Sequence, residues 1–160
     1  MKATLTIVCL VLAIFISTQL AFTSWHINQE INGWKDRAQV SSEPNDMLEW
    51  MTNVKEGMEK WDMVSGNAAL FFPTPSTDMA LIYHTVNQHI EQATVLTGMD
   101  RTSPQYQTGL DNLRGSIREL DIHAYQHWAN QGGLLLSIGC WFSWIAFIVF
   151  GFWWLIEATS

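Results

Sequence analysis

The sequence has 160 residues, with 15 acidic against 8 basic side chains and 48% hydrophobic residues, and its formal net charge is −7. A chain of this length that also carries two long apolar runs has room for one small polar domain. The acidic balance disfavours nucleic acid as a partner, because its phosphates would be repelled.

Two uncharged runs of membrane-spanning length lie near the two ends of the sequence, at residues 3–23 and 133–156. At about 1.5 Å per helical residue, each run can cross a hydrocarbon core of roughly 30 Å. The sequence therefore predicts two transmembrane helices, with residues 24–131 between them.

The flanking charges favour a topology with both termini in the cytoplasm. Lys2 is the only basic side chain outside residues 24–131, and basic flanks prefer the cytoplasmic side. We therefore predict a protein of the plasma (inner) membrane in which residues 24–131 are extracytoplasmic. Lys2 and the following apolar run are also typical of a secretory signal. The segment around Ala21 is a poor cleavage site, which favours a retained span, and either outcome leaves the domain outside.

Four stretches between the spans repeat apolar side chains at alternating steps of four and three, which predicts amphipathic helices. The stretches cover residues 27–34, 47–61, 79–96 and 106–127. The first continues the first span, and the second is expected to be capped by Asn45 after Pro44. The fourth has a start signal in Ser103 and Pro104 and is expected to run unbroken to the second span.

Short connections between these stretches favour an up-down bundle of three to four helices, so the predicted class is an all-α membrane protein. The connection at residues 65–77 is unusual, because it holds a glycine and two prolines and is nonetheless apolar. In an up-down bundle it returns to the bilayer, where Phe71 and Phe72 would enter the interface or bury against a neighbouring subunit. Aromatic rings also favour the membrane edge. The predicted membrane-interface residues are Trp25, Phe71, Phe72, Trp128, Trp153 and Trp154.

The second span carries a stripe of small residues that lets another helix approach closely, and two tryptophans lie deep in it. For these rings, packing on a partner helix is favoured over contact with a pigment or quinone. Gln19 is the only amide side chain in the first span and can hydrogen-bond to a partner helix. The predicted partner-packing residues are Gly139, Ser143, Ala146, Gln19, Trp141 and Trp144. The expected partners are other integral membrane subunits and the lipid bilayer, and self-association is left open.

Histidines and methionines raise the question of a cofactor. His123 and His127 share one helix face, and His26 follows the first span by about as many residues as His127 precedes the second. A cluster of His26, His123 and His127 is therefore the candidate metal or haem site, although histidines without a complete ligand set are more often structural. Methionines suggest copper, but the helical spacing of three of them favours core packing. We expect no cofactor, with haem or a metal ion as the alternative.

No glycine-rich phosphate loop, Cys-x-x-Cys, Gly-x-Ser-x-Gly or His-Glu-x-x-His occurs, which disfavours an enzyme. We expect a non-catalytic accessory or structural subunit of a larger integral membrane complex, whose outer helices dock or shield a partner. One alternative is a metal- or haem-binding redox subunit that uses the membrane-proximal histidines. Another is a ligand sensor that signals through a partner's helices, since only residues 1–2 and 157–160 are expected inside.

Overall fold

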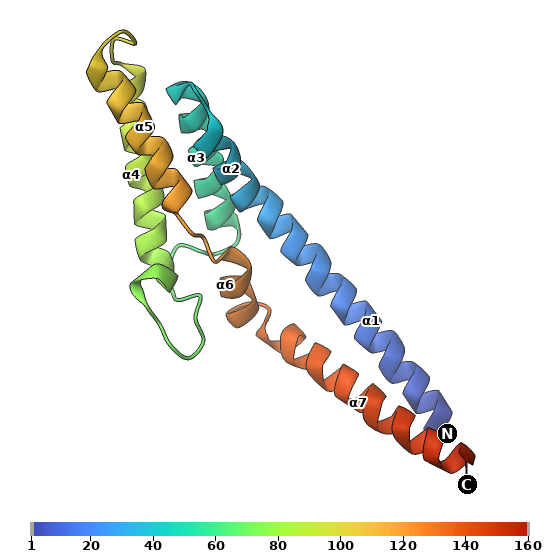
Figure 1. The fold of residues 1–160 in the computed structure, drawn as a ribbon. Coiled ribbons are helices and arrows are strands. Elements are labelled where there is room, and N and C mark those ends of the chain that lie inside the picture. Colours follow the sequence, from blue (N-terminus) through green and yellow to red (C-terminus); the bar gives the residue numbers. More distant parts are fainter. Residues whose placement is uncertain (1, 160) are drawn as a thin grey trace. The chain divides into compact units, whose positions relative to one another are not determined.

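The computed structural model describes the backbone of residues 2–159 and the side chains of residues 3–157 (Figure 1). Helices make up 80% of the chain, and no strand occurs within the described residues, so the predicted all-α class is confirmed. The chain divides into two compact units. We call Met1–Trp25 together with Gln131–Ser160 the span unit, and His26–Asn130 the head unit.

The span unit consists of α7 (Leu134–Thr159) and most of α1 (Lys2–Ile27). Two segments are long and apolar enough to cross a membrane, one within Ala3–Val40 and the other at Leu134–Glu157. Most of their large apolar side chains are exposed, an arrangement that suits lipid and not water.

The first helix continues beyond the span, as its apolar spacing predicts. α1 passes into a π-helical turn, η1 (Asn28–Asn32), and then into α2 (Gly33–Val40). Ile31 is fully buried in the core of the head unit. In η1 the Glu30 carbonyl approaches Gly57 so closely that a Cβ added there would lie 2.5 Å from the carbonyl oxygen. Only glycine allows this approach.

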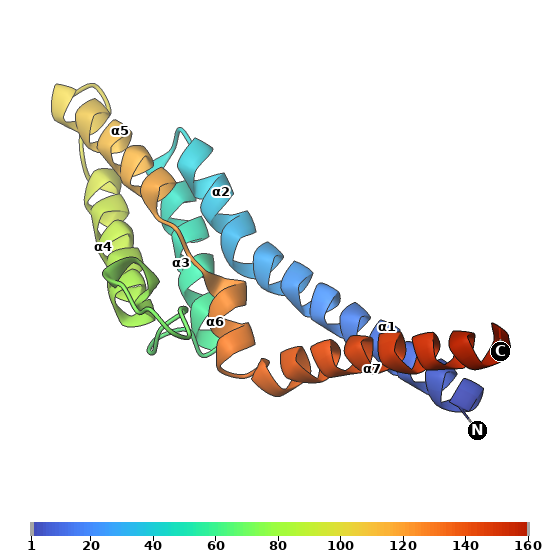
Figure 2. The same cartoon turned by 60° about the horizontal axis from the view of Figure 1, so that its bottom comes forward.

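The head unit packs four helices so that each contacts the next and the last contacts the first: α2, α3 (Pro44–Lys60), α4 (Met79–Thr97) and α5 (Pro104–Glu119). Consecutive helices run in opposite directions (Figures 1 and 2). The short α6 (Ala124–Asn130) contacts η1. Methionines occupy much of the core; those that are fully buried are Met47, Met51, Met58, Met63 and Met79.

Arg114 fastens α5 to the turn between α2 and α3. Its Nε donates to the Ser41 carbonyl at 2.6 Å, and its Nη1 bonds the Asp111 carboxylate at 3.1 Å on its own helix. The Ser41 hydroxyl in turn accepts from the Glu43 N–H at 3.1 Å. The turn is therefore held both locally and from α5.

The start predicted for the second helix is wrong. α3 begins at Pro44, and Glu43 precedes it without a capping side chain, so Asn45 is not the cap. Proline is favoured at the first helical position because the N–H that it lacks has no partner there. The start of α5 agrees with the prediction, since the Ser103 hydroxyl accepts from the Tyr106 N–H at 3.2 Å.

The fourth predicted helix does not run unbroken to the second span. α5 ends at Glu119, and four residues without helical structure separate it from α6. Leu120 and Ile122 are buried there while Asp121 is exposed, which is the two-residue alternation of extended chain. Lys35 donates to the Leu120 carbonyl at 3.2 Å and thus binds the point where the helix stops.

Candidate functional site

The connection between α3 and α4 forms a loop with a hydrogen-bonded base. Ala68 N–H donates to the Thr77 carbonyl at 2.8 Å, and Met79 N–H donates to the Gly66 carbonyl at 3.0 Å. Gly66 has φ of 83°, a left-handed conformation that favours glycine. The two sides of the loop are therefore joined as in a short hairpin.

At the tip of this loop, large apolar side chains face away from the protein. Phe71 and Phe72 are 79% and 85% exposed, and Leu70 is 52% exposed. Of the large apolar side chains described between His26 and Asn130, these two rings are the most exposed. The structured base thus presents a small apolar surface, and we call residues 70–73 the aromatic tip.

Helix α6 holds the base of the loop from a second side. His127 Nε2 donates to the Ser65 carbonyl at 3.0 Å, and Asn130 Nδ2 donates to the Ala68 carbonyl at 2.5 Å. Because a carbonyl can only accept, the neutral His127 ring carries its proton on Nε2. Its buried Nδ1 has no hydrogen-bond partner among the described residues.

Glu30 of η1 binds the end of α3, where the loop begins. Lys60 Nζ and Trp61 Nε1 donate to its two carboxylate oxygens at 2.6 and 2.7 Å. The hydrogen bond from Lys60 holds the pKa of Glu30 below its ordinary value, against the opposing effect of burial. Three elements, η1, α3 and α6, therefore converge on the loop.

Within the span unit, small side chains form the contact between α1 and α7. Ala13 is fully buried, and a Cβ added to Gly139 would lie 3.9 Å from Ile16 Cδ1, an ordinary contact distance. Ser17 bridges the helices: its hydroxyl accepts from Trp144 Nε1 at 3.1 Å and lies 3.3 Å from the Cys140 sulfur. The indole N–H thus has a partner inside an otherwise apolar contact.

The predicted partner-packing residues fall into two groups in this structure. Gly139, Ser143 and Ala146 are half-buried, Gly139 packs on the first span of the same chain, and Trp144 bonds Ser17 of that span. Gln19 and Trp141 are exposed, Trp141 at 73%. The side-chain amide of Gln19 makes no hydrogen bond to the described residues of its own chain. The surface that is left for a partner therefore carries an amide and a large ring.

The predicted membrane-interface residues are mostly exposed. Trp25 stacks on Phe22 with 6.2 Å between ring centroids, and Trp153 and Trp154 are about half exposed. Trp128 differs, because it is half-buried, packs against the head-unit core and stacks on Tyr125 at 6.0 Å.

The predicted histidine cluster does not form a ligand group. No set of three or more His, Cys, Asp or Glu side chains that could hold a metal ion occurs in the described part of the chain. His123 Nε2 lies 3.5 Å from the Asp121 carboxylate, whereas His127 bonds the Ser65 carbonyl. His26 lies close enough to Glu30 to help lower the pKa of that carboxyl group.

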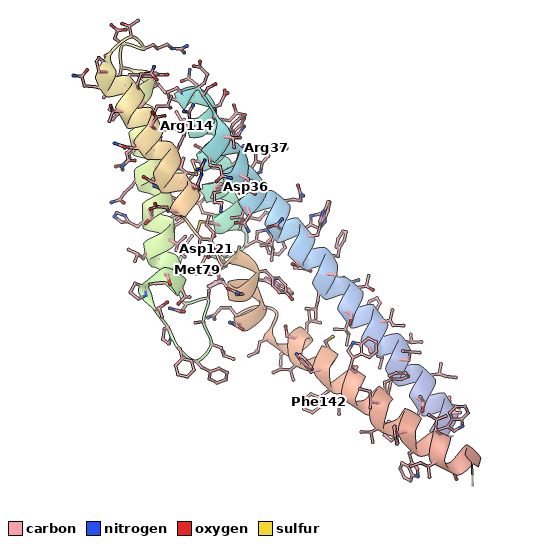
Figure 3. All side chains as sticks on the ribbon, in the orientation of Figure 1. Asp36, Arg37, Met79, Arg114, Asp121 and Phe142 are labelled. Atoms are coloured by element: carbon pink, nitrogen blue, oxygen red, sulfur yellow. The ribbon has the colours of Figure 1, made fainter. Side chains whose placement is uncertain are left out.

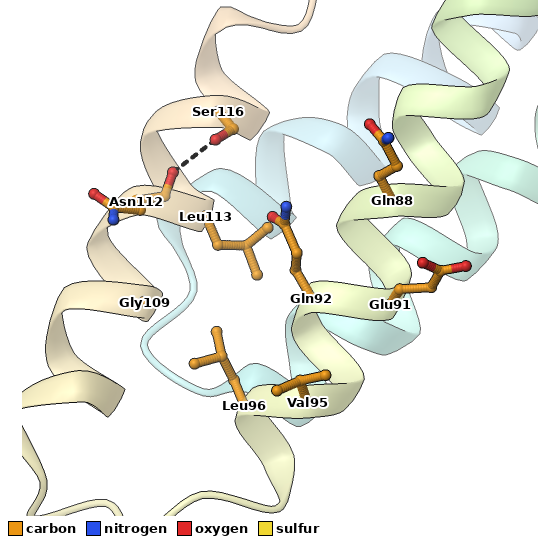
Figure 4. Close-up of a pocket in the computed structure, with 9 residues that line it drawn as sticks. All are labelled: Gln88, Glu91, Gln92, Val95, Leu96, Gly109, Asn112, Leu113 and Ser116. Atoms are coloured by element: carbon orange, nitrogen blue, oxygen red, sulfur yellow. Dashed lines mark hydrogen bonds between the residues drawn. The ribbon is translucent and has the colours of Figure 1, made fainter.

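An open groove of about 660 Å³ lies between α4 and α5 (Figure 4). Val95, Leu96 and Leu113 supply its apolar part, and the polar groups come mainly from Gln88, Gln92 and Asn112. Ser116 Oγ already donates to the Asn112 carbonyl of its own helix at 2.8 Å. The groove offers amide hydrogen bonding with one carboxylate, that of Glu91.

No protein-family model, curated protein or solved structure matches the chain. The candidate sites therefore depend on the geometry of the residues alone. Among the described residues, the aromatic tip and the outer surface of the span unit carry the most exposed aromatic rings, Phe71, Phe72 and Trp141 among them.

His89 is a histidine that lies on the buried side of α4. It is 4% exposed, and its Nδ1 has no hydrogen-bond partner among the described residues, whereas Ile90 is half-buried. Burial lowers the pKa of His89 from the ordinary value of 6.5. The folded state therefore binds fewer protons here than the unfolded state.

This difference predicts a loss of stability in acid. The contribution of His89 is fully present above pH 6.5 and is lost as the pH falls through the lower folded-state pKa. We expect the melting temperature of the full chain in mild detergent to fall between about pH 7.5 and about pH 5. His89→Leu should flatten this decrease, whereas His84→Leu, at an exposed position on the same helix, should not. Equal pH profiles for the two variants would contradict the assignment.

Proposed function

We propose that the chain is a two-span, non-catalytic accessory subunit of a larger integral membrane complex. In this proposal both termini are cytoplasmic, and the head unit is an up-down bundle on the extracytoplasmic side of the plasma membrane. Lys2, the only basic side chain outside residues 24–131, supports this orientation. The chain itself is assigned no catalytic residue and no cofactor.

One observation carries the proposal. The small residues that bring helices together are used within the span unit, where Gly139 packs on Ile16 and Ser17 bonds Trp144. The outer surface keeps Gln19 and Trp141 exposed. An amide at membrane depth gains from a hydrogen bond across to another helix, and a large ring gains contact area there. A neighbouring membrane subunit supplies both.

The test is retention of a partner by the full chain in mild detergent, with quantitative mass spectrometry of what co-purifies. We expect a membrane protein at fixed stoichiometry, and Gln19→Leu combined with Trp141→Ala should reduce its recovery about tenfold, equivalent to about 1.4 kcal/mol. Phe142→Ala removes a ring of similar exposure, 68%, about 100° round the same helix and serves as the control (Figure 3). Recovery that is the same in both variants would reject the proposal.

A further inference from the structure

We propose that the aromatic tip is a membrane-anchoring site, whose rings insert into the interface of the same bilayer that holds the spans. The inference goes beyond the accessory role, because it concerns lipid and requires no partner protein. It depends on three observations: the build of the loop, its place in the head unit and its lack of charge.

The build of the loop favours a preformed anchor. Its base is joined through Ala68 and Thr77 and is bound from outside by Asn130, while Phe71 and Phe72 face away from the protein. Rings held outward by a bonded base pay little ordering cost when they enter an apolar phase. Pro73 and Pro75 follow the rings and carry no N–H, which reduces the number of backbone donors that would need partners in the interface.

The place of the loop is fixed by contacts inside the head unit. The head unit begins at His26 and ends at Asn130, and at both points the chain passes into a candidate span. Glu30, four residues after His26, bonds Trp61 at the start of the loop, and Asn130 bonds Ala68 in its base. The loop therefore lies at the end of the head unit that holds the first and last residues of this unit, as the ribbon of the unit also shows (Figures 1 and 2). Because the chain connects to a candidate span at both of these residues, the proposal places this end of the head unit nearest the bilayer.

The loop segment between Asp62 and Asp78 is better suited to a bilayer surface than the rest of the head unit, because it carries no charge. No residue between Asp62 and Asp78 is charged, although the whole chain has a formal net charge of −7. Phenylalanine rings at the interface gain from leaving water, and an uncharged segment meets no repulsion from headgroups. Because the tip is apolar and uncharged and lies at this end of the head unit, we infer that it contacts lipid.

The experiment places a fluorescent reporter on the tip of the full chain in phosphatidylcholine vesicles. Cys9→Ala and Cys140→Ala remove the native thiols, and Phe71→Cys then carries a polarity-sensitive dye. Val40→Cys is the matched control, because Val40 is 73% exposed and ends α2 just before the first residue of α3, whereas the loop follows the last residue of α3. We expect lipids with a nitroxide near the headgroup to quench the dye at position 71 severalfold more than the dye at position 40.

Equal quenching at the two positions would overturn the proposal. So would a blue-shifted emission at position 71 without lipid quenching, because that result places the tip against protein, such as a second copy of the chain. Phe72→Cys provides a second labelling site if the first variant does not fold, as judged by its helical circular dichroism. The readout does not depend on a partner subunit, so its failure leaves the accessory role intact, and failure of co-purification leaves the anchor intact.

Discussion

Gly57→Ala is expected to destabilise the head unit by about 1–3 kcal/mol, the usual cost of overpacking. The added Cβ would meet the Glu30 carbonyl oxygen at 2.5 Å and Ile31 Cγ1 at 3.1 Å. The carbonyl is backbone in the π-helical turn η1, so relief requires α3 and η1 to move apart. Such a movement also weakens the bonds from Lys60 and Trp61 to the Glu30 carboxylate.

Gly115→Ala is the matched control for this substitution. Gly115 lies in α5 at an exposed position, and a Cβ added there meets nothing within 4 Å. Alanine at an exposed helix position is more stable than glycine by up to about 1 kcal/mol, so this variant should gain stability. Urea unfolding of the full chain in mild detergent, followed by tryptophan fluorescence, measures both changes. If Gly57→Ala and Gly115→Ala changed the free energy of unfolding in the same direction, the close contact at Gly57 would not determine the effect of the added Cβ.

Much of the fold follows from apolar spacing, and the physical reason is visible in the core. Met47, Met51, Val54 and Met58 lie at steps of four and three, and all four are fully buried. A helix that must bury one face has few other ways to place such residues. The same logic predicts that the first helix continues past its span, and the burial of Ile31 confirms it.

The break after α5 shows where helical spacing fails. Ile117, Leu120 and Ala124 fit a continuous helical stripe, and all are buried, yet the chain is extended between Glu119 and Ala124. The alternation of polar and apolar residues at Asp121, Ile122 and His123 indicates extended chain and argues against a continuous helix, and in the structure Ile122 is buried between exposed Asp121 and half-buried His123. The helical spacing and the two-residue alternation therefore overlap in these residues. The contact of Lys35 with the Leu120 carbonyl joins residues 85 apart in sequence, so local spacing cannot predict it.

The candidate sites were predictable to different degrees. Phe71 and Phe72 are recognisable as rings in a proline-containing connection, but their exposure depends on the bonds of Ala68 and Asn130. In the second span, the stripe of small residues at Gly139 predicts that another helix packs closely there, but it does not predict which helix. Ser17 is a small residue of the first span whose partners, Trp144 and Cys140, become evident only when both helices are paired.

Met51→Ala is expected to have the largest effect on the head unit, a loss of about 2–5 kcal/mol, because it removes a fully buried side chain and leaves a cavity. Met51→Leu keeps nearly the same volume and should cost less than about 1.5 kcal/mol. The pair tests what the core methionines do, since packing needs their volume and a soft metal such as copper needs their sulfur.

Urea unfolding separates the two roles when it is repeated with a chelator of copper. If the methionines are packing residues, the wild-type chain and the Met51→Leu variant unfold at similar urea concentrations, and the chelator changes neither. The burial of five methionines favours this outcome, because a flexible thioether fills irregular gaps between helices. The fully buried ones are Met47, Met51, Met58, Met63 and Met79. The copper-ligand role predicts a different result: Met51→Leu would lower the free energy of unfolding as much as Met51→Ala does, and the chelator would abolish this difference from the wild-type chain. That result would require a sulfur ligand in the core.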